Sequence, residues 1–374
     1  MQKIYWREMM KIDVKRMLVK AVISVIAVAI FLFGYYFVYL YCGYQRIEDK
    51  MYLDVVDNTE TEIPVNEELT LVTHNIGFGA YSDDYSFFMD GGEYGTAISE
   101  EAVESNLTGI IETLKKESPD LLLLQEVDID GTRSYHIDQT ERFSENFAEY
   151  DSVTAINYDS PYFFYPFHDP IGKNKSGMMT MSKYSILNSK RRSLPVEDSL
   201  YKYFDLDRAY SVTTMETTGK KVLMVYNVHL SAYTSDGTIA DEQLKLLLED
   251  MKAEYDKGRY VIAAGDFNKD LLGDSSKYFE RREGDFTWAK PINTELIPEG
   301  ITLYATSNAP SCRNADSPYR GDGTDFVLTV DGMLASDNVT VVSSETIDAG
   351  FSFSDHNPVK YKLILEDETV EIQK

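Results

Sequence analysis

The chain has 374 residues, of which 62 are acidic and 36 are basic, so its formal net charge is −26 at pH 7. A surface this acidic repels phosphate backbones at long range, which disfavours a dedicated nucleic-acid-binding protein. The only cysteines, Cys42 and Cys312, lie far apart in the sequence. Neither a disulfide framework nor a thiolate metal site is implied by them, and we expect two unpaired thiols.

The chain begins with a basic segment that leads into a long uncharged run. Residues 1–20 carry six basic and two acidic side chains, and residues 21–42 carry no charge. As a helix this run spans roughly 30 Å, the thickness of a bilayer core. A signal peptide is the alternative, but its apolar region is usually about 7–15 residues long and ends in small residues. Residues 35–41 are instead almost all aromatic or bulky, which is typical of a membrane interface.

The uncharged run, which starts at Ala21 and ends at Cys42, is therefore predicted to be an uncleaved, single transmembrane helix. The positive-inside rule places the basic residues 1–20 in the cytoplasm and everything after the span outside the cell membrane. Residues 43–66 are polar and acidic and are interpreted as a stalk. We expect one folded domain over residues 67–366 and a loose charged tail over 367–374.

Within the folded domain, apolar runs typical of buried strands alternate with amphipathic helical spacing. The predicted strands are 69–73, 120–124, 222–226 and 260–264, and the predicted helices are 102–116 and 242–254.

Five short motifs carry polar groups that suit a metal or a phosphate, and four of them follow or end a predicted strand. The motifs are Thr73-His74-Asn75-Ile76, Leu124-Gln125-Glu126-Val127, Asn227-Val228-His229-Leu230, Gly265-Asp266-Phe267-Asn268 and Ser354-Asp355-His356-Asn357-Pro358. Loops at strand ends are where such folds place catalytic groups. Amides, imidazoles and three carboxylates together suit an oxygen-ligated hard cation such as Mg²⁺ with a phosphate.

In their order and context these motifs resemble the endonuclease/exonuclease/phosphatase superfamily. That family includes pancreatic-type deoxyribonucleases, apurinic endonucleases, bacterial sphingomyelinases and inositol-phosphate phosphatases. The resemblance covers roughly residues 67–365, and its most specific parts are residues 265–268 and 354–356. It implies an α/β fold, a two-sheet β-sandwich flanked by helices in four α/β/β/α layers, and a metal-dependent phosphoesterase.

The resemblance implies a metal site formed by Asn75, Glu126 and Asp355, with Glu126 as the principal ligand. A carboxylate directly after a buried strand is costly unless it is paired or metal-bound, which agrees with this role. Mg²⁺ is the expected ion, with Mn²⁺ and Ca²⁺ as alternatives.

The resemblance also assigns the catalytic groups. Asp266 would orient or deprotonate the attacking water, and Asn268 would bind the pentacovalent phosphate. His229 would donate a proton or a hydrogen bond to the scissile phosphate.

His356 would contact the phosphate or act as the base, with Asp331 as the carboxylate that orients its ring. The family often has an aromatic residue, Ile or Val after this aspartate, whereas this chain has Gly332.

Three further residues are predicted to bind substrate. Asn227 shares a strand face with the first catalytic histidine and is expected to support the site. Asn174, or its neighbours Lys175 and Ser176, resembles a substrate-contacting strand entry of the family. Arg208 either binds phosphate or pairs with the adjacent aspartate.

Three functions remain open at this point. The first is a membrane-tethered phosphoesterase acting on a small or lipid-linked phosphodiester, which the anchor and the acidic charge favour. The second is an extracellular nuclease, which requires a basic groove. The sequence offers one basic cluster for it: Lys173, Lys175, Lys183, Lys190, Arg191 and Arg192. The third is a non-catalytic binding module, which should have lost ligand residues, yet none of the principal ones is missing.

Overall fold

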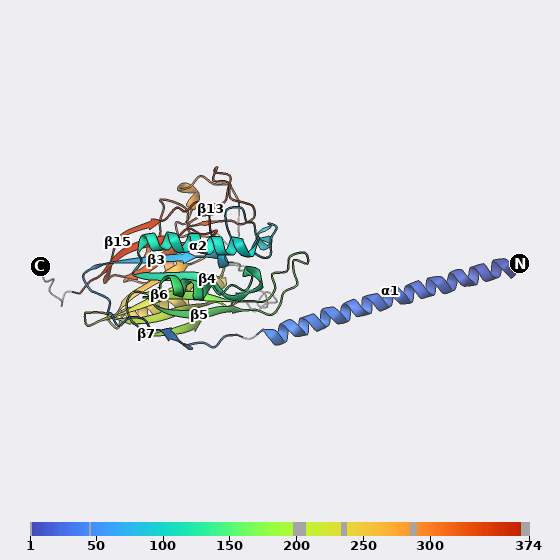
Figure 1. The fold of residues 1–374 in the computed structure, drawn as a ribbon, viewed down its shortest axis with the longest axis horizontal. Coiled ribbons are helices and arrows are strands. Elements are labelled where there is room, and N and C mark those ends of the chain that lie inside the picture. Colours follow the sequence, from blue (N-terminus) through green and yellow to red (C-terminus); the bar gives the residue numbers. More distant parts are fainter. Residues whose placement is uncertain (1, 45, 197–206, 233–237, 285–289, 368–374) are drawn as a thin grey trace. The chain divides into compact units, whose positions relative to one another are not determined.

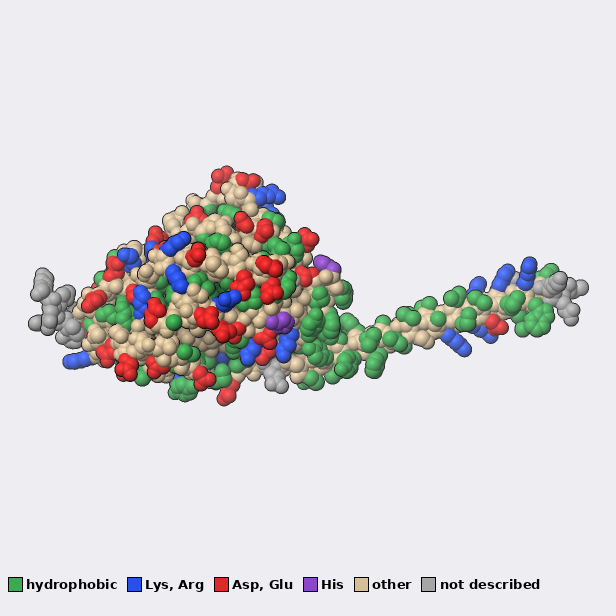
Figure 2. Space-filling model, viewed as in Figure 1, with side chains coloured by type: hydrophobic (Ala, Val, Ile, Leu, Met, Phe, Trp, Pro, Cys, Tyr) green, Lys and Arg blue, Asp and Glu red, His purple; other side chains and the backbone are tan. Residues whose placement is uncertain are grey.

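The computed structural model describes residues 2–44, 46–196, 207–232, 238–284 and 290–367, and the chain divides into the compact units Met1–Gln45 and Arg46–Lys374. The first unit consists mainly of helix α1 (Gln2–Gly43). Its segment Ile4–Gly43 is long and apolar enough to cross a membrane, and its most apolar part is fully exposed. Figure 2 shows hydrophobic side chains along most of α1, with Lys and Arg gathered toward its N-terminal end. An exposed helix that is apolar on all sides is typical of a membrane span or a signal sequence.

The second unit is built on two seven-stranded sheets (Figure 1). The first sheet has the order β15 (Val339–Thr346), β16 (Val359–Leu365), β3 (Glu68–Asn75), β4 (Leu121–Gly131), β6 (Asn174–Ser182), β5 (Asp151–Asp159) and β2 (Val55–Val56). The second has the order β1 (Tyr52–Leu53), β7 (Ile186–Ser193), β8 (Ala209–Glu216), β9 (Val222–His229), β10 (Tyr260–Asp266), β14 (Asp331–Ser336) and β11 (Ile301–Tyr304). A separate short ribbon pairs β12 (Cys312–Arg313) with β13 (Val327–Leu328).

Each sheet contains one parallel pair, and these two pairs carry four of the motifs. Strand β3 runs parallel to β4, and β9 runs parallel to β10, whereas the other described pairs are antiparallel. Parallel neighbours need a crossover, and helices α2 (Glu100–Glu117) and α4 (Thr238–Tyr255) supply it. Because parallel strands end at the same edge of a sheet, the polar ends of each pair lie side by side.

The main hydrophobic core lies between the two sheets. Leu71 and Leu123 of the first sheet and Val225 and Ile262 of the second belong to one fully buried cluster. On the outer face of the second sheet, the apolar side of α4 packs against β9 and β10. On the outer side of the first sheet, α2 contacts β3 and the short helix α3 (Gln139–Asn146) (Figure 1). The predicted four-layer α/β/β/α sandwich is thereby confirmed.

The predicted helices and strands of the folded domain are also present. Helix α2 begins at the N-cap Ser99, whose side chain accepts from the backbone N–H of Ala102 at 3.1 Å, and it ends at Ser118 in a left-handed conformation. Single 3₁₀ turns occur at Gly77–Gly79, Phe88–Asp90, Thr132–Ser134, Ser275–Lys277 and Thr294–Leu296.

Residues 43–66 were interpreted as a stalk, but most of this segment is part of the folded domain. Strand β1 pairs with β7 and β2 pairs with β5, so the segment adds an edge strand to each sheet. Ile63 is fully buried in the core between the sheets, and Arg46 forms an ion pair with Asp207 at 2.7 Å. The compact unit therefore begins at Arg46 rather than near residue 67. At the other end, the predicted tail 367–374 lies outside the described residues except for Asp367.

Candidate active site

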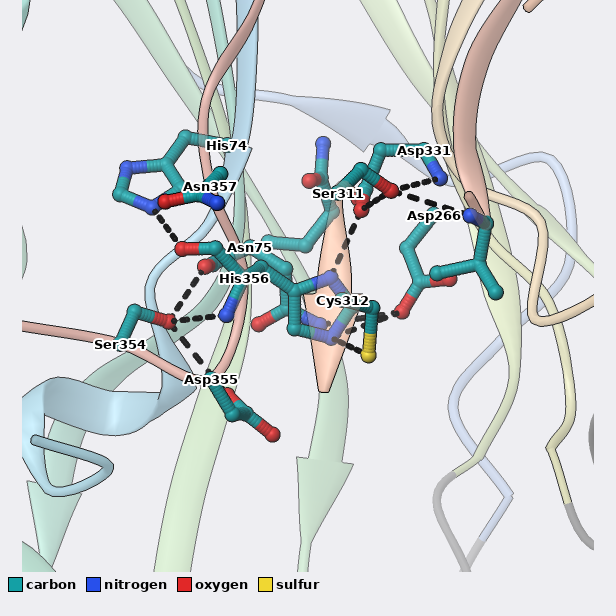
Figure 3. Close-up of polar contacts among 12 residues, drawn as sticks. His74, Asn75, Asp266, Ser311, Cys312, Asp331, Ser354, Asp355, His356 and Asn357 are labelled. Atoms are coloured by element: carbon teal, nitrogen blue, oxygen red, sulfur yellow. Dashed lines mark hydrogen bonds and ion pairs between the residues drawn. The ribbon is translucent and has the colours of Figure 1, made fainter. Parts of the chain in front are cut away.

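The ends of the motif strands meet between the two sheets, where Asn75 links them. Its side-chain Nδ2 donates to Asp266 Oδ2 across the sandwich at 3.1 Å and to Glu126 Oε1 at 3.2 Å. Asn75 is 1% exposed and Asp266 is 1% exposed. The close-up in Figure 3 shows Asn75, Asp266 and His356 converging from different elements. The structure therefore brings together residues that lie nearly 200 and more positions apart in the chain.

Glu126 projects from an irregularity in β4. The β4–β6 register shifts between Leu124 and Val127, and Glu126 has a φ of 55°, a left-handed conformation that only a few non-glycine residues adopt. Its side chain keeps 25% exposure. Burial raises the pKa of Glu126, and the nearby carboxylate of Asp355 raises it further. Two carboxylates that repel each other in a partly closed site suit a bound cation.

Asp355 is held beside this pair by Ser354. The Ser354 hydroxyl donates to the Asn75 carbonyl at 2.9 Å and accepts from the His356 N–H at 3.2 Å (Figure 3). Burial raises the pKa of Asp355, which is partly offset by the positive charge of His356. Glu126 and Asp355 thus present carboxylate oxygens whose negative charge is poorly compensated, which fits a hard divalent cation, whereas Asn75 turns its Nδ2 toward Glu126 and its Oδ1 accepts from the Gly77 N–H at 3.1 Å.

His356 and Asp331 form a buried hydrogen-bonded pair. His356 Nδ1 lies 2.8 Å from Asp331 Oδ2, and the Ser311 hydroxyl donates to the same oxygen at 2.8 Å. Although burial lowers the pKa of His356, the Asp331 carboxylate raises it, and the net result is well above the ordinary value. The imidazole is therefore expected to be protonated at neutral pH, with its ring fixed and Nε2 facing the site.

The unusual Gly332 after Asp331 has a steric explanation. It lies opposite Gly265 in the β10–β14 pair. A Cβ at Gly332 would meet Leu271 Cδ1 at 2.3 Å, and a Cβ at Gly265 would meet the Val228 carbonyl oxygen at 2.0 Å. The two glycines therefore allow close packing around the strand ends that carry the aspartates.

Asp266 is surrounded by hydrogen-bond donors and imidazoles. Its Oδ1 accepts from the Asn268 N–H at 2.8 Å, and its Oδ2 accepts from Asn268 Nδ2 at 3.2 Å. Oδ2 also lies 3.6 Å from His229 Nε2 and 3.9 Å from His356 Nε2. Burial raises the pKa of Asp266 to about 7, against the lowering effect of His356. A carboxylate with this pKa is well matched to proton transfer near neutral pH.

His229 has the opposite titration behaviour from His356. Its Nε2 lies 3.7 Å from Glu126 Oε1, and within the described part of the chain its Nδ1 has no hydrogen-bond partner. Burial lowers the pKa of His229 well below the ordinary value, and the positive charge of Arg208 lowers it further. The two imidazoles are therefore expected to be in different protonation states at neutral pH.

Two of the residues predicted to bind substrate have buried side chains that are hydrogen-bonded within the protein. Asn227 is fully buried and ties the sheets together, accepting from Gln125 Nε2 at 2.7 Å and donating to the Met179 carbonyl at 3.0 Å. Asn174 is also fully buried and accepts from the Arg133 N–H at 3.1 Å. Both amides make hydrogen bonds that hold the fold together, which agrees with the supporting role expected of Asn227, and contact of Asn174 with substrate stays a prediction.

Arg208 lies closer to the site. Its Nη1 donates to the Leu230 carbonyl at 3.0 Å, and the same carbonyl accepts from Asn268 Nδ2 at 2.9 Å. Arg208 therefore lies beside Asn268, and its positive charge acts on His229. Asp207, the alternative partner considered for it, forms ion pairs with Arg46 and Arg191.

Sequence reasoning missed two residues that adjoin the site. Arg133 is buried, forms an ion pair with Asp128 at 2.7 Å, and its positive charge lowers the pKa of Glu126. Cys312 is free and buried, and its Sγ lies 3.5 Å from His356 Nε2. For Arg133 the only local signal in the sequence was its position, seven residues after Glu126. For Cys312 the sequence contains no local signal.

Comparison with known proteins agrees with this geometry. Residues 72–356 match the model of a family described as the Endonuclease/Exonuclease/phosphatase family. No curated protein matches the sequence.

Solved structures share the fold at low sequence identity. An endonuclease/exonuclease/phosphatase from Beutenbergia cavernae is 18% identical, with 80% of this chain and 72% of that chain covered and a TM-score of 0.56. ANGEL2, a 2′,3′-cyclic phosphatase crystallised with adenosine-2′,3′-vanadate, is 15% identical, with 85% and 99% covered and a TM-score of 0.53.

Proposed function

Because this chain belongs to the Endonuclease/Exonuclease/phosphatase family, whose members are hydrolases of phosphoesters, we propose that it is a divalent-metal-dependent phosphodiesterase. The observation that carries the proposal is the convergence of five motifs around Asp266, whose Oδ2 accepts from Asn75 and faces both His229 and His356. No principal group of the family pattern is missing, which argues against a non-catalytic binding module.

Asn75, Glu126 and Asp355 would hold the metal, with Mg²⁺ as the expected ion and Mn²⁺ or Ca²⁺ as alternatives. When bound, the cation would supply a Lewis acid that polarises a phosphoryl oxygen. Its charge would also compensate for the burial that raises the pKa of Glu126 and of Asp355.

Asp266 would orient the attacking water and accept its proton, because its carboxylate is fixed by Asn75 and Asn268 and has a pKa near neutrality. Asn268 would hold the phosphate through its amide. His356, protonated and oriented by Asp331, would donate a hydrogen bond to the charge that develops on a phosphate oxygen in the transition state.

For His229, the lowered pKa favours one of the two roles considered. A neutral imidazole donates a hydrogen bond to the scissile phosphate more readily than it delivers a proton to the leaving group. Arg208, two hydrogen bonds away through the Leu230 carbonyl, would add positive potential at the same place.

The substrate class is inferred from charge and location. Three of the six residues in the basic cluster expected for a nuclease are paired with carboxylates, since Arg191 is buried against Asp207, Arg192 pairs with two carboxylates and Lys183 pairs with Asp120. These pairings reduce the positive charge available to follow a nucleic-acid backbone. A small or lipid-linked phosphodiester is therefore favoured over duplex DNA.

We further propose that α1 tethers the enzyme in the cell membrane, with the basic N-terminus in the cytoplasm and the catalytic domain outside. A tether would keep the active site near lipid headgroups. Exposed aromatic side chains at Phe164, Tyr165 and Phe167, the last 85% exposed, suit contact with a membrane interface.

A substrate panel tests the proposal. The protein beginning at Arg46 would be offered bis-p-nitrophenyl phosphate, sphingomyelin, inositol phosphates and plasmid DNA, each with Mg²⁺ or with EDTA. We expect Mg²⁺-dependent turnover of a small or lipid-linked ester that is lost in Glu126→Gln. Preferential, salt-sensitive cleavage of DNA would assign a nuclease instead, and no turnover of any substrate by the folded protein would refute the enzyme.

A further inference from the structure

The guanidinium of Arg133 is held in one orientation by contacts along one edge and on one face. Nε donates to Asp128 Oδ2 at 3.1 Å and Nη2 donates to Asp128 Oδ1 at 2.7 Å, so the two planar groups pair through two hydrogen bonds. Nη2 also donates to the Ser176 hydroxyl at 3.3 Å. The Cζ atom lies 3.8 Å from the centre of the Phe78 ring, on which the guanidinium packs. Both the plane and the direction of the charged group are therefore fixed by the fold.

The third nitrogen of this guanidinium, Nη1, remains available for a ligand. Among the described residues it has no hydrogen-bond partner, and it is not enclosed by the protein, although the Arg133 side chain as a whole is only 8% exposed. Its two N–H groups can donate to a bound molecule without first breaking a bond inside the protein. Because the side chain is already immobilised, binding there also costs little side-chain entropy.

The surroundings of Arg133 place it beside the candidate active site. The residue before Phe78 is a glycine at which a Cβ would lie 2.9 Å from Asp355 Oδ1, so the ring that supports the guanidinium adjoins that carboxylate. Burial raises the pKa of Glu126, and the positive charge of Arg133 opposes this rise. Burial lowers the pKa of His229 in the other sheet, and the charge of Arg133 adds to this lowering. The charge thus acts on groups from both sheets that face the site.

We propose that Arg133 binds the substrate directly, donating from Nη1 to a non-bridging phosphate oxygen, and that Asp128 is the positioning residue that aims it. A charge-assisted hydrogen bond to an anionic oxygen is roughly twice as strong as a neutral one, and arginine stays protonated at every working pH. The identity of the phosphate as part of the substrate rests on the proposed function. The anion contact itself does not, because inorganic phosphate presents the same oxygens.

A lysine substitution separates anion binding from structural support. Arg133→Lys keeps a positive charge for the fully buried Asp128, but its single nitrogen replaces three and the donor that faces the site is lost. If this protein does not fold, Arg133→Gln combined with Asp128→Asn removes both charges together, which avoids leaving either one buried and unpaired. Arg142→Gln is the matched control, because Arg142 is 43% exposed and pairs with Glu104 on the surface.

The first readout is the affinity for inorganic phosphate, measured by calorimetry on the full-length protein in detergent with saturating Mg²⁺. We expect the wild type and Arg142→Gln to bind phosphate equally and Arg133→Lys to bind it at least about tenfold more weakly. Urea unfolding of the same proteins reports the structural contribution of Arg133 separately. Equal phosphate affinity in the wild type and Arg133→Lys would overturn the contact and leave Arg133 as a support of Asp128 alone, and a wild type that binds no phosphate would overturn it as well.

The second readout is hydrolysis of bis-p-nitrophenyl phosphate. In Arg133→Lys we expect KM to rise by about the same factor as the phosphate affinity falls, with a smaller change in kcat, because the contact is present before and during the reaction. A fall in kcat with KM unchanged would overturn substrate contact and assign Arg133 an effect through Glu126. Phosphate binding that depends on Arg133, in a protein that hydrolyses no phosphoester, would refute the proposed function and uphold the anion contact.

Discussion

The raised pKa of Asp266 predicts that this carboxylate destabilises the metal-free domain as pH rises. Its folded-state pKa is about 7, against 3.8 for the free side chain. The folded protein therefore binds the proton more tightly than the unfolded chain, and stability is lost as pH rises from about 4 through 7. The shift of roughly three units corresponds to an upper limit of about 4 kcal/mol, with the full cost present above pH 7.

The substitution Asp266→Asn tests this magnitude. The amide removes the charge but places a donor where Oδ2 now accepts from Asn75 and Asn268, which costs about 1–3 kcal/mol at every pH. The variant should thus be less stable than the wild type near pH 4 and gain relative stability as pH rises. The difference between the two proteins should change by up to about 4 kcal/mol between pH 4 and 8.

Urea unfolding of the unit Arg46–Lys374 in EDTA, followed over this pH range, gives the free energies, and unchanged m-values serve as the control for two-state behaviour. A stability difference that stays constant with pH would refute the raised pKa and with it the role of Asp266 as a base.

Three further predictions follow from individual contacts. Asp331→Asn should lower the pKa of His356 and shift the basic limb of the kcat profile to lower pH, which pH-rate measurements would detect; an unshifted limb would remove His356 from the rate-limiting chemistry. Deleting residues 46–66 should destabilise the domain by more than the roughly 2–5 kcal/mol that truncating Ile63 alone would cost, whereas deleting residues 1–45 should leave urea unfolding unchanged. Asn227→Ala should cost about 1–3 kcal/mol in stability by leaving its partners in both sheets unsatisfied, and a change in KM without any loss of stability would restore its role in substrate binding.

Local patterns were sufficient to predict the parts of the site that lie on buried strands. The apolar runs before Asn75, Glu126 and Asp266 marked the strands, and their polar ends meet because each sheet has one parallel pair. The pairing of Asp331 with His356 was implied by the resemblance to the family, in which an aspartate orients the imidazole.

Contacts that depend on long-range packing were not predictable in the same way. Strands β1 and β2 have two residues each, too few for a periodicity, so residues 46–66 read as a polar stalk although they complete both sheets. Charge counting grouped Arg191 with neighbouring lysines as free positive charge. In the structure Arg191 forms an ion pair with Asp207, which belongs to another part of the sequence. The place of Cys312 beside His356 depends on a two-residue ribbon whose register no sequence pattern reveals.

The most direct test of the central claim is the rate of bis-p-nitrophenyl phosphate hydrolysis as a function of Mg²⁺ concentration, for the wild type and for His356→Ala. The substitution removes the imidazole that Asp331 orients into the site. We predict saturable Mg²⁺ dependence in the wild type and a loss of at least about a hundredfold in the variant, the lower bound typical of a positioned acid–base group. Hydrolysis that is unaffected by EDTA, or equal in the two proteins, would contradict the assignment of the strand ends as a phosphodiesterase centre.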